Sequence, residues 1–204
     1  MNEGAGRALP NARVRRFMLA IQDVMGQSGL AAVLRQASLQ RFANTLPPAN
    51  DEPGLHAAEY AALTQAIENY YGRGARGTLL RIGYASFNRL AAAQRFTASF
   101  YQRVLRVLPM QNRQVLTLRW LASDLARPGG RVSVHLDDRR LNLVDYESDA
   151  TVGRRRDSEI CWVTVGEIQE SLKWGTGLEY DVSELNCKAK GDAACRFEIR
   201  DPLG

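Results

Sequence analysis

The hydrophobic pattern of this chain changes its period once. Up to residue 127, apolar side chains recur every three or four positions, which is the spacing of one face of an α-helix. From residue 132 they recur at every second position, as in Val132, Val134 and Leu136, which is typical of a strand with one buried face. The pattern therefore predicts a helical first part and a β-rich last part.

Glycine and proline divide the helical part. Gly26, the loop "TLPPANDEPG" (45–54) and "GRGARG" (72–77) each interrupt the periodicity, and Asn11 is placed to cap the first helix. "GRGARG" lies between two helical stretches, so it is interpreted as a helix stop and close-packing element. The predicted helices cover residues 13–25, 28–43, 55–71, 78–108 with a break near 94–95, and 112–125.

The last part predicts an antiparallel sheet that one helix interrupts. Two strands, 132–136 and 141–146, are joined by a turn at "DDR", and two more follow at 178–184 and 195–199. Between the pairs, an apolar stripe of helical spacing begins at Cys161. The expected class is α+β, with a helical segment and proline-rich loop at 1–54 and a ligand-binding domain at 55–204, forming one compact unit.

Composition and charge limit the location of the protein and the classes of molecule that it is expected to bind. The chain is 45% hydrophobic and 24% charged, as in soluble globular proteins. No apolar run is expected to span a membrane and residues 1–10 lack signal-peptide features, so a cytoplasmic location is predicted. The net charge is +5, and apart from Arg154, Arg155 and Arg156 in a polar loop the basic residues are scattered. Scattered arginines on helices are interpreted as solvated faces, and with no nucleic-acid motif, nucleic acid is not an expected partner.

The three cysteines carry the clearest chemical signal. Strand phase points Glu184 and Cys195 toward the interior, Cys161 falls on the apolar face of its helix, and a hairpin brings Cys187 close. A buried, unpaired carboxylate is costly, and zinc held by three thiolates and one carboxylate would neutralise it. Four protein ligands leave no position for an activated water, so such a zinc would be structural. The alternative is three buried cysteines acting as small hydrophobes, with a bulge exposing Glu184.

At these positions the sequence resembles the 4-vinyl-reductase-like domain family. The shared pattern is a cysteine that opens a helix, then E-x-x-C, Gly-Asp in a turn, and C-x-F-x-I; here it comprises Cys161, Glu184–Cys187, Gly191–Asp192 and Cys195–Ile199. The family includes sensor domains of phenol- and xylene-responsive activators and stand-alone proteins of bacteriochlorophyll biosynthesis. It is more distantly similar to haem-based nitric-oxide sensors and vesicle-tethering subunits. The resemblance implies zinc at the four residues and the ligand-binding fold of those sensors.

The first function hypothesis is a binding module. It would hold a small hydrophobic or aromatic ligand, with a tetrapyrrole as one candidate, and act as a sensor, carrier or accessory protein. The polar ligand-anchoring residues of the phenol sensors have no counterpart here, and neither His56 nor His135 falls in such a place. Aromatic side chains are the candidate pocket lining, although each could equally fill the core: Tyr84, Phe87, Phe96, Phe100, Trp120 and Trp162.

Two further hypotheses stay open. The family name implies a vinyl reductase of bacteriochlorophyll biosynthesis, but no nicotinamide or flavin motif is recognised, and no serine or cysteine lies in a nucleophile motif, so direct catalysis is not expected. A dimeric scaffolding protein is the other, because the related tethering subunits pair through helices. A homodimer is also compatible with the binding module.

Overall fold

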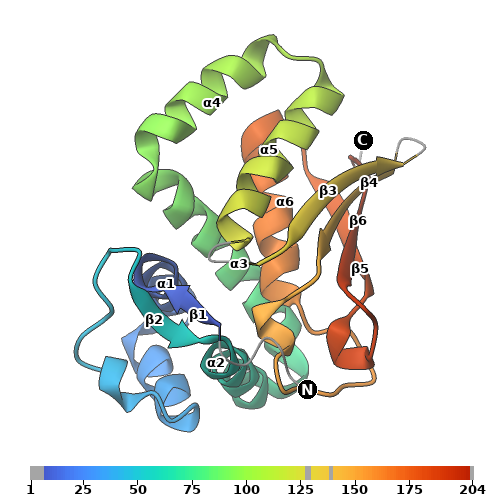
Figure 1. Ribbon diagram of the computed structural model, residues 1–204. Helices are drawn as coiled ribbons and strands as arrows, with labels where there is room; N and C mark the ends of the chain where they lie inside the picture. Colours follow the sequence, from blue (N-terminus) through green and yellow to red (C-terminus); the bar gives the residue numbers. More distant parts are fainter. Residues whose placement is uncertain (1–6, 127–129, 138–139, 203–204) are drawn as a thin grey trace.

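The computed structural model describes residues 7–126, 130–137 and 140–202 (Figure 1). Its N-terminal part is a helical layer with a small two-stranded ribbon. The ribbon pairs Ala8 with His56 and Leu9 with Leu55, so the start of the chain is held beside a segment far along it. The elements of this part are β1 (Ala8–Pro10), α1 (Asn11–Gln36), η1 (Gln40–Phe42), β2 (Pro53–His56) and α2 (Ala57–Tyr71).

The middle of the chain is helical throughout. After the 3₁₀ turn η2 (Gly72–Gly74), α3 runs into the centre of the molecule, and α4 turns away from it to form an arch that α5 brings back (Figure 1). The predicted break near residue 94 is confirmed, because Gln94 leaves the helical conformation and separates α3 from α4. The bounds are α3 (Ala75–Ala93), α4 (Arg95–Val107) and α5 (Met110–Leu125).

The C-terminal part is a four-stranded antiparallel sheet in the order β3-β4-β6-β5. Helices α5 and α6 cover one of its faces, and α3 lies on their other side (Figure 1). The strands and their helix are β3 (Val132–Asp137), β4 (Arg140–Asp145), α6 (Trp162–Thr176), β5 (Tyr180–Asn186) and β6 (Cys195–Pro202), with short turns η3 (Asp149–Thr151) and η4 (Lys188–Lys190). The predicted α+β class, with helices first and a sheet interrupted by one helix, is confirmed.

Two glycines allow the central helices to cross at close range. A Cβ atom on Gly83 of α3 would lie 2.2 Å from the carbonyl oxygen of Val163, and one on Gly166 of α6 would lie 2.3 Å from that of Leu80. Only glycine permits this approach. The crossing brings α6, and Cys161 at its start, against the helical layer, and one continuous hydrophobic core runs from Leu9 to Ile199.

The structure corrects several local predictions. Asn11 is the first helical residue rather than the cap, which is Pro10, and the strand predicted from residue 178 starts at Tyr180. Residues 53–56 form β2 instead of loop and helix, because they pair with β1. Gly26 does interrupt the first helix, with φ of 73°, although the two halves continue as one kinked α1. The predicted turn at 137–139 and the helix stop at 127–130 lie partly outside the described residues.

Helix α1 is long and apolar enough, by length and composition, to cross a membrane, which corrects the expectation that no stretch qualifies. In this structure the apolar side chains of α1 instead pack in the hydrophobic core, against α2 and α3. The buried residues of the helix include Val14, Phe17, Met18, Ile21, Leu30, Val33 and Leu34. Their burial explains the hydropathy of α1 by packing.

Candidate metal centre and aromatic cluster

The structure brings together the four predicted metal ligands. Cys161 caps the N-terminus of α6, Glu184 lies near the end of β5, Cys187 follows that strand, and Cys195 begins β6. The hairpin between β5 and β6 turns at Gly191, whose φ of 102° favours glycine. The predicted hairpin through "AKGD" is therefore confirmed, and it brings the two hairpin cysteines together beneath α6.

One potential ligand atom from each residue lies within 4.8 Å of the other three. The sulfurs of Cys161 and Cys195 are 3.6 Å apart, and none of the cysteines is in a disulfide. A cation held about 2.3 Å from each thiolate in a tetrahedron separates the sulfurs by about 3.8 Å, so the observed spacing needs little adjustment.

The buried carboxylate of Glu184 is the strongest local indication that this site binds a cation. Its side chain is buried, and Oε2 accepts a hydrogen bond from the Cys161 amide at 3.0 Å, whereas Oε1 is buried with no hydrogen-bond partner. No Lys or Arg of the described residues forms an ion pair with it. Burial, followed by the neighbouring Cys187, raises the pKa of Glu184 to about 8. The predicted inward orientation of Glu184 is confirmed; a bulge is present in β5, but it follows this residue.

The thiols compete for protons in the same small volume. Hydrogen bonding to Cys187 and Cys195, together with burial, raises the pKa of Cys161, while hydrogen bonds with Cys161 and Cys195 lower the pKa of Cys187. Although Cys161 acts in the opposite direction, Cys187 and burial raise the pKa of Cys195. Backbone amides add to the stabilisation of negative charge, because Lys188 N–H donates to Cys195 Sγ at 3.4 Å. The arrangement therefore favours anionic sulfur at Cys187 and disfavours it at Cys161 and Cys195, whose protons a bound cation would have to displace.

The six aromatic residues predicted to line a pocket do not converge. Phe96 and Phe100 lie on the outer side of α4, 80% and 65% exposed, and Trp162 lies under the guanidinium of Arg76, 4.4 Å from ring centroid to Cζ. Tyr84 donates a hydrogen bond to Gln169. Phe87 and Trp120 are the two that pack together, edge to face, with ring centroids 5.7 Å apart.

This pair belongs to a cluster of four rings from four helices, which the spacing along the sequence did not reveal. Trp174 of α6 packs on Trp120 at 5.0 Å between centroids, and Tyr101 of α4 stacks on its other side at 5.5 Å and 30°. The indole N–H of Trp120 donates to Gln94 at 3.1 Å. We call Phe87, Tyr101, Trp120 and Trp174 the aromatic cluster.

Two hollows on the surface of the described residues lie elsewhere. One, of about 400 Å³, is on the open face of the sheet and includes His135, Asn142 and Arg196. The other, of about 1160 Å³, lies beside η3 and η4 and is lined largely by charged and polar groups from 146–157 and 188–193. Neither contains a predicted pocket residue.

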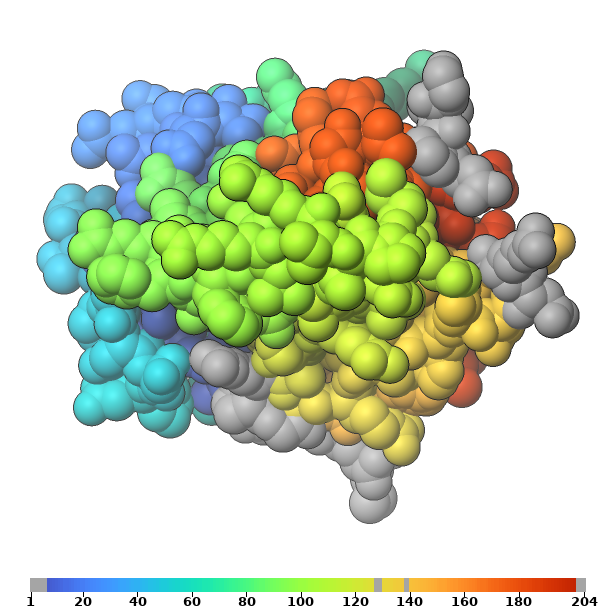
Figure 2. Space-filling model, turned by 90° about the horizontal axis from the view of Figure 1, so that it is seen from above, coloured from blue at the N-terminus to red at the C-terminus, as the bar shows by residue number. Residues whose placement is uncertain are grey.

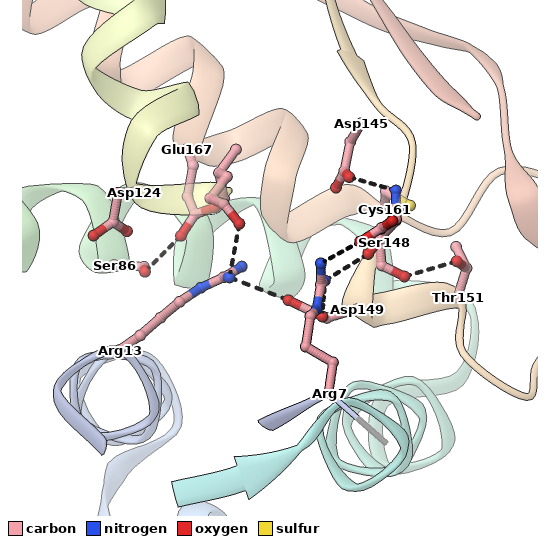
Figure 3. Close-up of polar contacts among 12 residues, drawn as sticks. Arg7, Arg13, Ser86, Asp124, Asp145, Ser148, Asp149, Thr151, Cys161 and Glu167 are labelled. Carbon is pink, nitrogen blue, oxygen red and sulfur yellow. Dashed lines mark hydrogen bonds and ion pairs between the residues drawn. The ribbon is translucent and has the colours of Figure 1, made fainter. Parts of the chain in front are cut away.

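A buried ion-pair network links the N-terminal layer to the rest, and sequence reasoning missed it (Figure 3). Arg13 of α1 lies 3.1 Å from Asp149 of η3, which also pairs with Arg7. Nearby, Arg16 pairs with Asp124 at 2.5 Å, and Ser86 donates to half-buried Glu167 at 2.7 Å. The expectation of solvated arginines is therefore wrong for these side chains, because each is only 14% exposed and lies against an acidic partner from a distant segment.

Comparison with known proteins gives the fold a wider context. No family model matches the sequence, and no curated protein matches it. Solved structures do: an H-NOX protein from S. oneidensis in the Fe(II)NO ligation state (12% identity, TM-score 0.57, covering 91% of this chain and 97% of that one) and an H-NOX protein from K. algicida in the Fe(II) unliganded state (11%, 0.59, 96% and 99%). A third, from work on haem distortion in the H-NOX family, has 10% identity and a TM-score of 0.62, covering 96% and 97%. At such identities the likeness shows the fold, and it confirms the predicted similarity to nitric-oxide sensors.

These comparisons correct two predictions. Membership of the 4-vinyl-reductase-like family, and with it the vinyl reductase, is contradicted, because no family model matches and these neighbours are H-NOX proteins. The prediction of zinc as the cofactor is contradicted as well, since the cofactor with which such neighbours are described is haem.

The described residues of this chain do not fit haem. An axial ligand is needed, commonly histidine or cysteine. His56 is exposed and caps α2, His135 is exposed on β3, and the three cysteines face one another in the buried centre. None of these five side chains adjoins the aromatic cluster, so the fold is shared without a corresponding iron ligand of either type.

Proposed function

We propose that this chain is a small-molecule-binding domain that takes a planar, apolar ligand at the aromatic cluster, beneath α4. The H-NOX neighbours are described with haem and nitric oxide, and the shared fold supports binding of a small molecule by this chain. The observation that carries the proposal is the aromatic cluster itself. Its four rings come from α3, α4, α5 and α6 and meet at one place in the core.

Helix α4 supplies the route of entry. Only Ala98 and Leu105 of this helix are buried, so a small outward movement of α4 breaks few contacts. Tyr101 is the ring that α4 contributes, and it is stacked on Trp120. A ligand ring that replaces Tyr101 would stack on the indole in the same way, and Gln94 offers a polar group at its edge.

The class of ligand follows from what surrounds the cluster. With no histidine or cysteine beside it, binding does not depend on an iron–protein bond, so a metal-free tetrapyrrole or another flat aromatic compound suits it better than haem. The role would be that of a sensor or carrier. A cytoplasmic domain is part of the proposal, and burial of the apolar side chains of α1 supports a water-soluble one.

We also propose that Cys161, Glu184, Cys187 and Cys195 hold one thiophilic divalent cation. The buried Oε1 atom of Glu184, without a partner, and the sulfurs around it support this assignment. With four protein ligands the shell is filled, so the cation would serve the fold by joining α6 to the β5–β6 hairpin. Elemental analysis of protein purified without added metal identifies the ion.

Titration with iron-free protoporphyrin IX, followed by tryptophan emission, tests the ligand proposal. Saturable quenching is expected, because Trp120 and Trp174 lie in the aromatic cluster. Trp120→Phe should weaken binding about tenfold by removing the stacking surface, whereas Trp162→Phe, outside the cluster, should leave the affinity unchanged. If neither protoporphyrin nor smaller aromatic probes bind, or if both variants behave alike, the proposal is wrong.

Homodimerisation stays a prediction. Sedimentation velocity over a range of protein concentrations measures it directly. A dimer that forms without ligand or cation would support the scaffolding alternative only if the chain also failed to bind small molecules.

A further inference from the structure

Helix α4 has two apolar sides, and the core uses one of them. Ala98 and Leu105 point inward, while Phe96, Phe100 and Val107 lie on the outer side. The spacing of four and seven residues places those three in one stripe along the helix. Phe96 and Val107 are about four-fifths exposed, at 80% and 81%, which is unusual for large apolar side chains that serve only the fold. We call Phe96, Phe100 and Val107 the outer stripe.

The outer stripe lies on a ridge. Figure 2, which views the molecule from above, shows α4 as a light-green bar across this face, with no other described segment in front of it. Protruding side chains on a convex ridge suit a deformable surface, whereas a folded protein partner would need a matching groove.

The charge around the outer stripe is of one sign. Residues 69–123 contain nine arginines and no Asp, Glu or Lys, whereas the rest of the chain has 18 basic and 22 acidic residues. The net positive charge of the protein is therefore concentrated in α3, α4 and α5. On α4 itself, Arg95, Arg103 and Arg106 are exposed, and none forms an ion pair with any described residue.

We propose that the outer side of α4 docks onto an anionic lipid surface, with the outer stripe inserted at the level of the headgroups and the three arginines paired with phosphates. Apolar side chains on one helix face flanked by arginine are the features of helices that lie in the membrane interface. The aliphatic stem of Arg103, which shares the face, would follow the stripe while its guanidinium reaches the phosphates. Complementary charge argues for this occupant.

A second copy of the chain fits the outer stripe less well. In a two-fold symmetric contact the same surface meets itself, so Arg95, Arg103 and Arg106 of one copy would face their equivalents. No carboxylate between residues 69 and 123 is present to offset that repulsion.

Flotation of the full chain with lipid vesicles tests the proposal. The protein should float with vesicles of phosphatidylcholine containing about one third phosphatidylglycerol and remain behind with phosphatidylcholine alone. Binding should weaken as salt rises to about 0.5 M, because screening shortens the reach of the arginines. Phe96→Ser/Phe100→Ser should reduce binding about tenfold or more. Its control is Tyr70→Ser/Tyr71→Ser, which removes two exposed aromatic rings at the end of α2 and should have no effect.

The results that overturn the proposal are distinct from one another. Absence of flotation at low salt excludes lipid docking. Flotation that survives the Phe96→Ser/Phe100→Ser change places the contact elsewhere. A dimer that this change dissociates, without any vesicle binding, assigns the stripe to a second copy. Phe100 packs edge to face on Tyr101 of the aromatic cluster, with 6.4 Å between ring centroids, but the vesicles contain no aromatic ligand, so none of these outcomes depends on the proposed ligand.

Discussion

The backbone amide of Cys161 donates a hydrogen bond to the Glu184 carboxylate, with 3.0 Å between nitrogen and oxygen. This contact joins the N-terminus of α6 to the edge strand β5 and occupies one oxygen of a buried acid. It leaves the other oxygen facing three thiols without a partner. The positive end of the helix dipole favours charge there, but one amide does not compensate a desolvated carboxylate.

Loss of one thiol should destabilise the fold. Cys187→Ser and Cys195→Ser are each expected to lower the free energy of unfolding by about 3 kcal/mol or more, because binding of the proposed cation would contribute to folding. Chelation of the wild-type protein should lower its melting temperature and leave the variants unchanged. Differential scanning calorimetry with parallel elemental analysis measures both. A fully folded, metal-free wild type with the same melting temperature contradicts the site.

The role of Glu184 can be separated from that of the cysteines. Glu184→Gln keeps an oxygen that accepts the Cys161 N–H but removes the charge, so cation affinity should fall by about tenfold or more. In metal-free protein the same change should stabilise the fold, because it removes a carboxyl whose pKa burial raises. Competition with a chromogenic chelator and urea unfolding give the two quantities. Unchanged affinity would mean that the carboxylate is not a ligand.

The buried pair of Arg13 and Asp149 should matter far more than an exposed pair. Asp149→Asn leaves Arg13 without its ion-pair partner and Arg7 with Glu147 alone, and we expect a loss of about 3 kcal/mol or more. The matched control is Asp23→Asn, whose exposed ion pair with Arg89 should contribute less than about 1 kcal/mol. Urea unfolding compares them. Equal effects would show that burial does not strengthen the dependence on Asp149.

Asp145 should make stability depend on pH. Burial, with a smaller contribution from Asp149, raises the pKa of Asp145 to about 6 from the ordinary 3.8. The hydrogen bond from the Glu147 N–H and the charges of Arg13 and Arg7 lower the pKa, but they do not offset burial. The folded chain therefore binds this proton more tightly than the unfolded chain. The stabilisation is complete below about pH 4 and is lost as pH rises toward 6, by up to about 3 kcal/mol. Asp145→Asn should remove this loss; a difference from wild type that stays constant between pH 4 and 7 contradicts the assignment.

The crossing of α3 and α6 should reject any side chain. A Cβ on residue 166 would also lie 3.1 Å from the Cα of Gly83, so Gly166→Ala should cost about 2 kcal/mol or more through displaced backbone. Gly77→Ala is the control, since this exposed position has no atom near its added methyl group. It should stabilise α3 by up to about 1 kcal/mol. Thermal unfolding of both variants decides whether the glycine or the close approach is responsible.

Much of the local structure was accessible without coordinates. The break before Arg95, the interruption at Gly26 and the inward phase of Glu184 all follow from short-range rules: helix period, glycine conformation and the alternation of a strand. The convergence of the four candidate ligand side chains was also predicted, because a tight hairpin holds Cys187 and Cys195 close together.

Other features depend on partners that are remote in sequence. The strand Ala8–Pro10 is too short to carry a period of its own and exists because Pro53–His56 pairs with it. The aromatic cluster needs four helices in their final positions. Ten positions were singled out from the sequence as aromatic pocket residues or metal ligands. The two on α4, Phe96 and Phe100, were assigned to the pocket, because hydropathy cannot distinguish an apolar helix side that is buried from one that is exposed.

The sequence alone determined most of the helices, the four strands of the main sheet and which side of these strands carries acid or sulfur, since those depend on neighbours a few residues away. The tertiary structure decided which arginines are buried, which aromatic rings meet and which side of α4 is left uncovered. Burial is a property of the assembled chain: a side chain leaves water only when a second segment arrives to cover it.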